Sequence, residues 1–291
     1  MQKHPLAEVF GFPCDNMSIE AKRYRNLKLC PFNNKVPNCT KDKANDPLGV
    51  CSIYEASAPV ITCPIRFREN WQIAEDAAKF FFQEGTNWTS LTEVRLADAE
   101  GKSAGNIDLV LVSYDASGKI TGFGAVEVQA VYISGNVRRP FATYMADPEQ
   151  MSSMDWTNES NYPRADYLSS SRKRLAPQLI YKGGILKTWN RKTAVVLNDG
   201  FFSTLPKLKS VKPEDADIAW LVYGLSRDEV CDSYRLHLEK AVYTKFDNAL
   251  DQITRSTAGN EETFLNLLQN KLDDKLDSVN PPDIHTIDED I

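Results

Sequence analysis

Histidines and long apolar runs are both scarce in this sequence. The 291 residues include three histidines, His4, His237 and His285, whose positions suit neither a catalytic triad nor a histidine-rich metal site. We interpret all three as structural or surface groups. No window approaches the ~20 consecutive apolar residues of a membrane span. The start of the chain, MQKHPLAEVF, lacks the basic-then-apolar layout of a secretory signal, so we expect a cytoplasmic protein.

The net charge of −6 by itself argues against nucleic acid as a partner. The charge is uneven, however, because residues 1–68 hold ten Lys and Arg against six Asp and Glu, whereas the residues from 260 onward hold nine acidic and two basic residues. Local basic groups decide phosphate binding. Two clusters are candidates for DNA contact, although such clusters are most often solvated surface: Arg138 with Arg139, and Arg172, Lys173 and Arg174.

The most informative motif is a predicted β-hairpin that carries acidic residues. Residues 107–112 have the pattern of a buried strand, residues 115–119 (DASGK) that of a turn, and residues 123–132 that of the returning strand. Glu127 and Gln129 are two residues apart on the second strand, so their side chains share one face, while Val128 points into the opposite layer. Asp108 can then lie opposite them.

Two carboxylates arranged in this way suit a divalent cation. Hydrolysis of a phosphodiester needs a hard ion, usually Mg²⁺, held by carboxylate oxygens, and Asp108 and Glu127 are the candidate ligands. In most nucleases of this architecture the third group on this face is Lys, but here it is Gln129. Because glutamine is neither a general base nor a positive charge, we expect it only to position the attacking water.

Four of the six cysteines fall in one stretch, which lacks compact Cys-x-x-Cys pairs: Cys30, Cys39, Cys51 and Cys63. In a cytoplasmic chain such a cluster favours a bound metal over disulfides, and the turn-rich surroundings have little apolar content to build a core. Four thiolates suit a structural Zn²⁺ or a single iron equally well, and the alternative is four ordinary buried thiols. Cys14 is left out of the set, and Cys231, in a helix-like run, is interpreted as a core residue.

The predicted domains are a four-cysteine metal-binding module over residues 1–66, a main domain over 67–275 and an acidic, flexible tail over 276–291. The composition, 42% hydrophobic and 25% charged, is that of ordinary globular protein. No internal repeat is present.

Within the main domain the pattern predicts alternating helices and strands. The expected order is a helix over 67–82, a strand over 91–96, the hairpin, an irregular segment over 134–168, a helix over 170–189 broken near Pro177 and Gly183, strands over 193–197 and 218–225, and helical patterns over 227–255 and 261–276. Helix, three strands, helix, strand is the core plan of the PD-(D/E)xK nucleases. The predicted fold class is therefore α/β, a mixed central sheet flanked by helices, with the small N-terminal module beside it.

Several segments together resemble the NotI family of type II restriction endonucleases. They are HPLAEVFGFP, Cys30-Pro31-Phe32, Pro47-Leu48-Gly49-Val50-Cys51, Thr92-Glu93-Val94-Arg95-Leu96, GKSAGNIDLVLVSYD and Glu127-Val128-Gln129. The resemblance covers most of residues 4–200 and fades beyond about residue 202.

This resemblance implies a homodimer with a PD-(D/E)xK core that cleaves both strands of a GC-rich, GGCC-containing DNA palindrome with Mg²⁺. It also implies that the four-cysteine site holds iron. Asp108, Glu127 and Gln129 match the family's catalytic positions, and Glu93 matches a further acidic position. On residues alone, the alternative is a non-cleaving DNA-binding or redox-sensing metalloprotein in which the Asp108 and Glu127 carboxylates are structural.

Overall fold

A six-stranded mixed sheet organises the main body of the protein. The computed structural model describes residues 3–43 and 45–277. Of the tail predicted over 276–291, the part from residue 278 onward lies outside the described residues, as does His285. The strands run in the order β14 (Ser233–Thr244), β13 (Ile218–Asp228), β12 (Thr193–Asn198), β9 (Ile120–Gln129), β8 (Ser103–Tyr114) and β7 (Trp88–Ala97). β12 is parallel to both of its neighbours and the other pairs are antiparallel, which confirms the predicted mixed central sheet.

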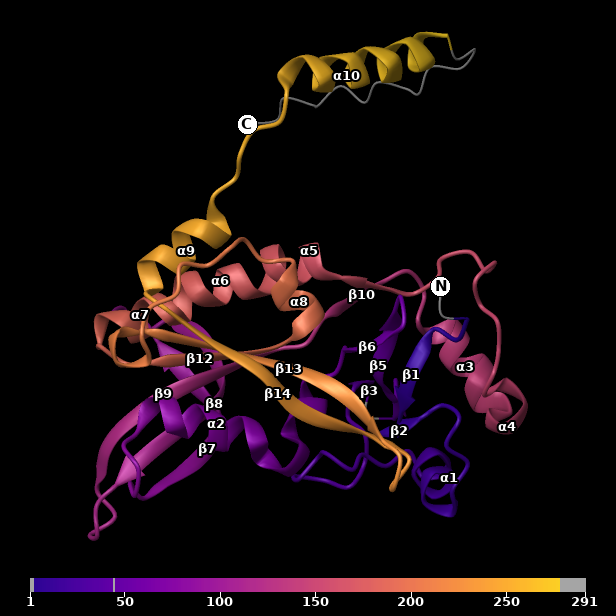
Figure 1. The fold of residues 1–291 in the computed structure, drawn as a ribbon. Helices are drawn as coiled ribbons and strands as arrows, with labels where there is room; N and C mark the ends of the chain where they lie inside the picture. Colours follow the sequence, from indigo (N-terminus) through magenta and orange to yellow (C-terminus); the bar gives the residue numbers. More distant parts are fainter. Residues whose placement is uncertain (1–2, 44, 278–291) are drawn as a thin grey trace. The chain divides into compact units, whose positions relative to one another are not determined.

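Helices cover both faces of this sheet (Figure 1). On one face, α2 (Gln72–Phe81) buries Ile73, Ala77 and Phe80 against alternate residues of the central strands, among them Val128. The other face packs against a long helical run over residues 167–188, together with α8 (Asp199–Ser203) and α9 (Phe246–Thr254). Burial on both faces explains why β12, TAVVLN, is apolar almost throughout.

The helical run over 167–188 is continuous where the sequence predicted breaks. It consists of α5 (Tyr167–Ser170), the π-helical turn η2 (Ser171–Leu175), α6 (Ala176–Gln178), a second π-helical turn η3 (Leu179–Gly183) and α7 (Gly184–Thr188). A π-helical turn directly precedes α6, which contains Pro177, and another ends at Gly183, so the chain absorbs both residues without leaving the helix.

Within the predicted N-terminal module, the chain forms a four-stranded sheet of its own. The strand order is β2 (Phe12–Pro13), β1 (Leu6–Val9), β5 (Val50–Glu55) and β6 (Ala58–Ile61), all antiparallel. Its apolar cluster includes Leu6, Phe10 and Ile53, and also Phe141 and Tyr144 from α3 (Arg138–Ala146). The region therefore contributes apolar residues to a core, and it shares that core with α3.

Two further predictions fail near the C-terminal side of the sheet. The stretch predicted to be helical over 227–255 is mostly strand, since β13 continues to Asp228 and β14 follows, and only α9 is helical. Cys231 is exposed in the turn between these strands and is not a core residue. Residues 134–168, predicted to be irregular, contain α3, α4 (Pro148–Met151) and β11 (Arg164–Asp166) besides loops, and they also include the end of a strand at Ser134 and the first residues of α5.

The remaining elements are short, apart from the last helix. They are α1 (Ile19–Asn26), β3 (Asp42–Lys43), β4 (Asp46–Pro47), the 3-10 helices η1 (Pro64–Trp71) and η4 (Pro213–Asp215), β10 (Tyr132–Ser134) and α10 (Glu261–Leu276). The chain divides into two compact units, one ending at Ile253 and one beginning at Thr254, and α10 belongs to the second. No helix in the described part of the chain has both the length and the apolar character needed to cross a bilayer.

Candidate active site

Asp108 and Glu127 lie side by side on neighbouring strands. The regular pairing of β8 with β9 ends at Leu109 and Val126, so these two acidic residues come next along the strands. Asp108 accepts a hydrogen bond at Oδ2 from the backbone N–H of Val128, at 2.8 Å. The carboxylate thus takes the place of a backbone acceptor where the ladder stops, which fixes it beside Glu127.

Glu127 sits on a strand with partners on both sides and is 4% exposed. Burial, and then the nearby Asp108 carboxylate, raise the pKa of Glu127 to about 7, against the opposing effect of Lys182. Its Oε1 atom is buried and has no hydrogen-bond partner among the described residues. A buried, unpartnered carboxylate oxygen is costly unless a cation or water completes it, so this atom points to a ligand position.

Gln129 lies two residues further on the same face as Glu127, and both line one small enclosed space with Gln178 and Lys182. Its Nε2 donates to Oε1 of Gln178, whereas its own Oε1 is buried without a partner within the described chain. Val128 packs into the opposite core, beneath α2. Glu127 and Gln129 therefore lie on one face of β9 and Val128 on the other, as predicted.

Glu93 lies across from Asp108 on the edge strand. β7 and β8 pair through Thr92 with Leu109 and through Val94 with Ile107, so Glu93 and Asp108 are the residues between those pairs. Glu93 has a φ of 57°, a left-handed conformation that is strained for a residue with a side chain. Its carboxylate is exposed and accepts from Lys35 Nζ at 3.0 Å, a contact that lowers the pKa of Glu93.

A cavity of about 190 Å³ opens at this place. Its lining includes both carboxylates, Asp108 and Glu93, and two cations, Arg68 and Arg174. Arg174 also acts electrostatically on Glu127 and helps to lower its pKa. The cavity thus places the positive charges of Arg68 and Arg174 beside the carboxylates of Asp108 and Glu93. Positive charge of this kind favours binding of a phosphodiester next to a metal site.

The other basic residues predicted to contact DNA differ in whether acidic side chains pair with them. Arg172 and Lys173 are exposed on the first π-helical turn. Arg138 is paired with Asp42 and Asp46, and Arg139 with Glu159 at 2.8 Å. Because these acids offset the charge of Arg138 and Arg139, that pair offers less free positive charge than the sequence predicted.

Lys182 is the residue that sequence reasoning missed. It is 4% exposed, and its Nζ donates to Glu127 Oε2 at 2.5 Å and to the backbone oxygen of Asn106 at 2.8 Å. Gln178, one turn earlier, was missed as well. The spacing of four residues between Arg174, Gln178 and Lys182 was a readable signal, but nothing in the sequence says which strand that helix face meets.

The four predicted metal-binding cysteines are all free, and three of them are buried. Cys30 is near enough to Cys39 and Cys63 for their thiols to affect it, and Cys51 is near enough to Cys30 and Cys63. Within residues 3–43 and 45–277, however, no group of three or more His, Cys, Asp or Glu side chains is arranged to hold a metal ion. The arrangement of the thiols therefore does not support the predicted iron or zinc site.

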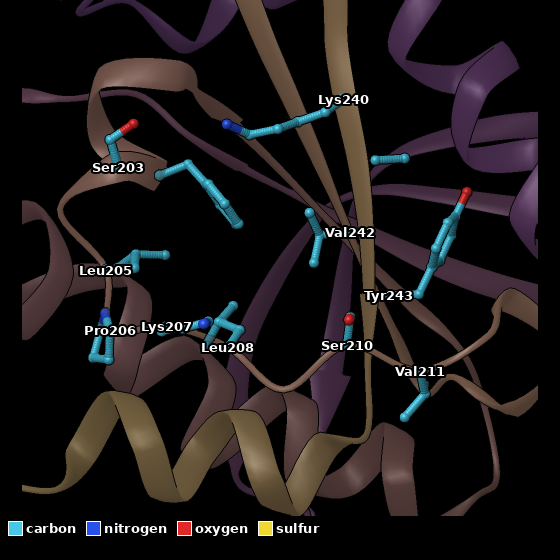
Figure 2. Close-up of a pocket in the computed structure, with 12 residues that line it drawn as sticks. Ser203, Leu205, Pro206, Lys207, Leu208, Ser210, Val211, Lys240, Val242 and Tyr243 are labelled. Atoms are coloured by element: carbon cyan, nitrogen blue, oxygen red, sulfur yellow. The ribbon is translucent and has the colours of Figure 1, made fainter.

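A larger cavity, of about 740 Å³, lies elsewhere, between the segment around 202–211 and β14 (Figure 2). Lys240 extends into this region from β14, where it pairs with Asp199 at 3.0 Å. None of Asp108, Glu127 and Gln129 lines it. The candidate active site is therefore the pair Asp108 and Glu127 and not the larger cavity.

A mixed sheet that presents paired carboxylates on adjacent strands, beside arginines, has the groups expected of an enzyme acting on phosphodiesters. The comparisons with known proteins agree with this class: the model of the restriction endonuclease NotI family matches residues 15–236. The chain belongs to the NotI restriction endonuclease family and is a type II site-specific deoxyribonuclease. No curated protein matched the sequence directly. The family makes DNA the partner, and because its members are endonucleases it disfavours the non-cleaving alternative.

Proposed function

We propose that this enzyme cuts both strands of a GC-rich DNA palindrome with Mg²⁺, using Asp108 and Glu127 as the metal ligands. The observation that carries the proposal is the juxtaposition of these two carboxylates, together with the burial of Glu127 Oε1, which has no hydrogen-bond partner in the described part of the chain. Carboxylate oxygens with room for retained waters are what Mg²⁺ prefers. When bound there, the ion would polarise the phosphate and make its bound water acidic enough to supply hydroxide near neutral pH.

The chain's own residues take the remaining roles. Gln129 positions the attacking water through its Oε1, which no described residue contacts by a hydrogen bond, while Gln178 accepts from its Nε2 and fixes the orientation of the amide. Glu93, across from Asp108, contributes a carboxylate to the rim that helps hold the ion or its water. Arg174 faces the phosphate within the small cavity, and Arg172 and Lys173 contact the flanking DNA backbone.

We propose that the main domain has the PD-(D/E)xK core. Its order, α2, then β7 to β9, then the helical run over 167–188 and then β12, is the order predicted from the sequence. GC-rich specificity follows the family resemblance, with Arg on guanine O6 and N7 as the expected contact. Cleavage of both strands of a palindrome needs two sites related by a dyad, so we propose a homodimer.

The test is cleavage of phage DNA by purified protein. Discrete fragments in Mg²⁺, lost on addition of EDTA, support the proposal, and sequencing of the fragment ends gives the target and the cut position. Asp108→Ala and Glu127→Ala should each reduce cleavage by at least ~100-fold while specific binding in Ca²⁺ persists. Glu100→Ala is the matched control, since this carboxylate is exposed and pairs with Lys102, away from Asp108 and Glu127. If Asp108→Ala cleaves DNA at the wild-type rate, the assignment of the active site is wrong.

We also propose a structural iron, with Zn²⁺ as the alternative, on Cys30, Cys39, Cys51 and Cys63. The family resemblance and the mutual proximity of the thiols support it, although their present arrangement is not that of a metal site. Elemental analysis and an absorption spectrum of the purified protein distinguish iron from zinc. Cys39→Ala should lower metal content and thermal stability more than it lowers chemistry, whereas Cys231→Ala, in an exposed turn, should change neither. If the purified wild-type protein contains neither iron nor zinc, the proposed metal site is wrong and the four cysteines are ordinary thiols.

A further inference from the structure

Lys182 brings a positive charge into the site from outside the strand motif. Its ammonium group is held by Glu127 Oε2 and by the carbonyl oxygen of Asn106. Its stem passes close to Gly105, where an added Cβ would lie 3.8 Å from Lys182 Cδ. Two of the three ammonium hydrogens are therefore used within the described chain, and the position of the charge is fixed.

Burial of a lysine at this place is not explained by packing. Removing an ammonium ion from water costs several kcal/mol even after relaxation, and an apolar side chain of similar length would fill the same space without that cost. We therefore infer that the positive charge of Lys182 has a functional role at this position. Its immediate neighbours are Glu127 and Gln129, which line the same small space.

The strand itself supplies no cation here, because the residue two after Glu127 is a neutral glutamine. The helix face opposite the strand carries Arg174, Gln178 and Lys182 at intervals of four residues. Gln178 contacts Gln129, and Lys182 contacts Glu127. The helix thus contacts the strand at both positions, and in the pair of Lys182 with Glu127 the cation is on the helix side.

We propose that Lys182 supplies, from the helix, the fixed positive charge that the strand motif of this enzyme lacks. It is a positioning residue: its hydrogen bond to Oε2 holds the Glu127 carboxylate in a fixed orientation, and its charge offsets the negative charge that develops at the phosphate during cleavage. This inference rests on the proposed function of Asp108 and Glu127. The alternative is that Lys182 only ties the helix to the sheet.

The experiment moves the charge from helix to strand. Lys182→Met is compared with the double variant Lys182→Met/Gln129→Lys, in which the ammonium returns to the same enclosed space from the strand. Lys187→Met is the matched control, because this lysine lies one turn further on the same helical run and pairs with Asp217 at 3.0 Å, away from the acidic pair. Single-turnover cleavage at saturating protein, specific DNA binding in Ca²⁺, and the rise in melting temperature caused by Ca²⁺ alone are measured for each.

We expect Lys182→Met to slow single-turnover cleavage by ~100-fold or more. Its DNA affinity should stay within about threefold of wild type, and Ca²⁺ should still raise its melting temperature, because Lys182 is not a metal ligand. The double variant should recover at least ~10-fold of the lost rate, whereas Lys187→Met should cut within about threefold of wild type.

Three results would overturn the inference: Lys182→Met cutting at nearly the wild-type rate, a double variant no faster than Lys182→Met, or loss of the Ca²⁺ effect in Lys182→Met. Asp108→Ala, measured in parallel, separates this inference from the proposed function. If Asp108→Ala also cuts normally, the whole site is wrong. If only Lys182→Met cuts normally, the role of Lys182 alone is wrong.

Discussion

At the scale of single residues, the acidic site is largely a property of strand alternation. Period-two spacing places Glu127 and Gln129 on one face, and the hairpin register brings Asp108 beside them, so these positions were readable from the sequence. Lys182 was not readable in the same way. Its contact with Glu127 joins residues 55 apart in the sequence, and that contact depends on how the helix crosses the sheet.

Glu93 illustrates strain kept at a candidate site. Its left-handed backbone costs about 1 kcal/mol or more for a residue with a side chain. The ion pair of Glu93 with Lys35 is exposed to solvent and offsets little of this cost. Glycine removes a left-handed strain of about 1–2 kcal/mol and adds a chain-entropy cost of about 0.5–1 kcal/mol, so Glu93→Gly should raise the free energy of unfolding by about 0.5–1 kcal/mol in urea denaturation. If the carboxylate serves the metal site, the same variant should slow cleavage by at least ~10-fold.

The control for this prediction is Glu93→Gln, which removes the charge and keeps the strained backbone. It should slow cleavage to a similar degree without any gain in stability. A Glu93→Gly protein that is less stable than wild type would show that the backbone conformation is not strained.

At the scale of elements, sequence patterns identified α2, the hairpin, β12 and α10, because each has a clear apolar period or a turn. They failed for β14, whose run SYRLHLEKAVYT was taken as helical. That strand is defined by 11 paired positions with β13, and such cross-strand contacts override the helix preference of Leu, Glu and Lys. The position of the 167–188 helix was equally unreadable, since it depends on packing against distant residues.

The close fit of that helix depends on Gly183. A Cβ on Gly183 would lie 2.7 Å from Phe246 Cε2 of α9, while one on the adjacent Gly184 would meet nothing within 4 Å. Gly183→Ala should therefore lower the free energy of unfolding by about 1–3 kcal/mol. Because the displaced helix carries Lys182, the variant should also slow cleavage, as measured by single-turnover kinetics.

Gly184→Ala is the neighbouring control. It adds the same methyl group to open space in the same helical run, and should leave stability unchanged or raise it by up to about 1 kcal/mol through helix propensity. Equal destabilisation by the two substitutions would mean that contact with Phe246 is not the cause.

At the scale of the whole molecule, the N-terminal sheet and the large sheet meet at a buried ionic junction. Arg66 donates to Glu8 on β1 at 2.9 Å, to Glu69 at 2.6 Å and to the backbone oxygen of Tyr234 on β14 at 2.9 Å. Its guanidinium also lies over the ring of Phe32, 4.2 Å from the ring centre. The family match, which covers residues 15–236, includes Arg66, Glu69 and Tyr234 but begins after Glu8.

This junction makes a strong prediction about stability. Arg66 and Glu8 have fully buried side chains, so Arg66→Met leaves the Glu8 carboxyl in an apolar place without its counter-charge. Burial already raises the pKa of Glu8, and the loss of Arg66 removes the largest opposing influence. We expect Arg66→Met to lower the free energy of unfolding by about 3–5 kcal/mol in chemical denaturation.

The double variant Arg66→Met/Glu8→Gln tests the cause of that loss. A glutamine at position 8 is neutral and can still accept the hydrogen bond that Ser52 Oγ donates to Glu8 at 2.7 Å. If the uncompensated buried charge is the main cost, the double variant should be more stable than Arg66→Met by at least about 1.5 kcal/mol, a coupling typical of residues in one ionic network. If it is no more stable, Arg66 joins the two sheets mainly through its contacts with Glu69, Tyr234 and Phe32, and the charge of Glu8 is incidental.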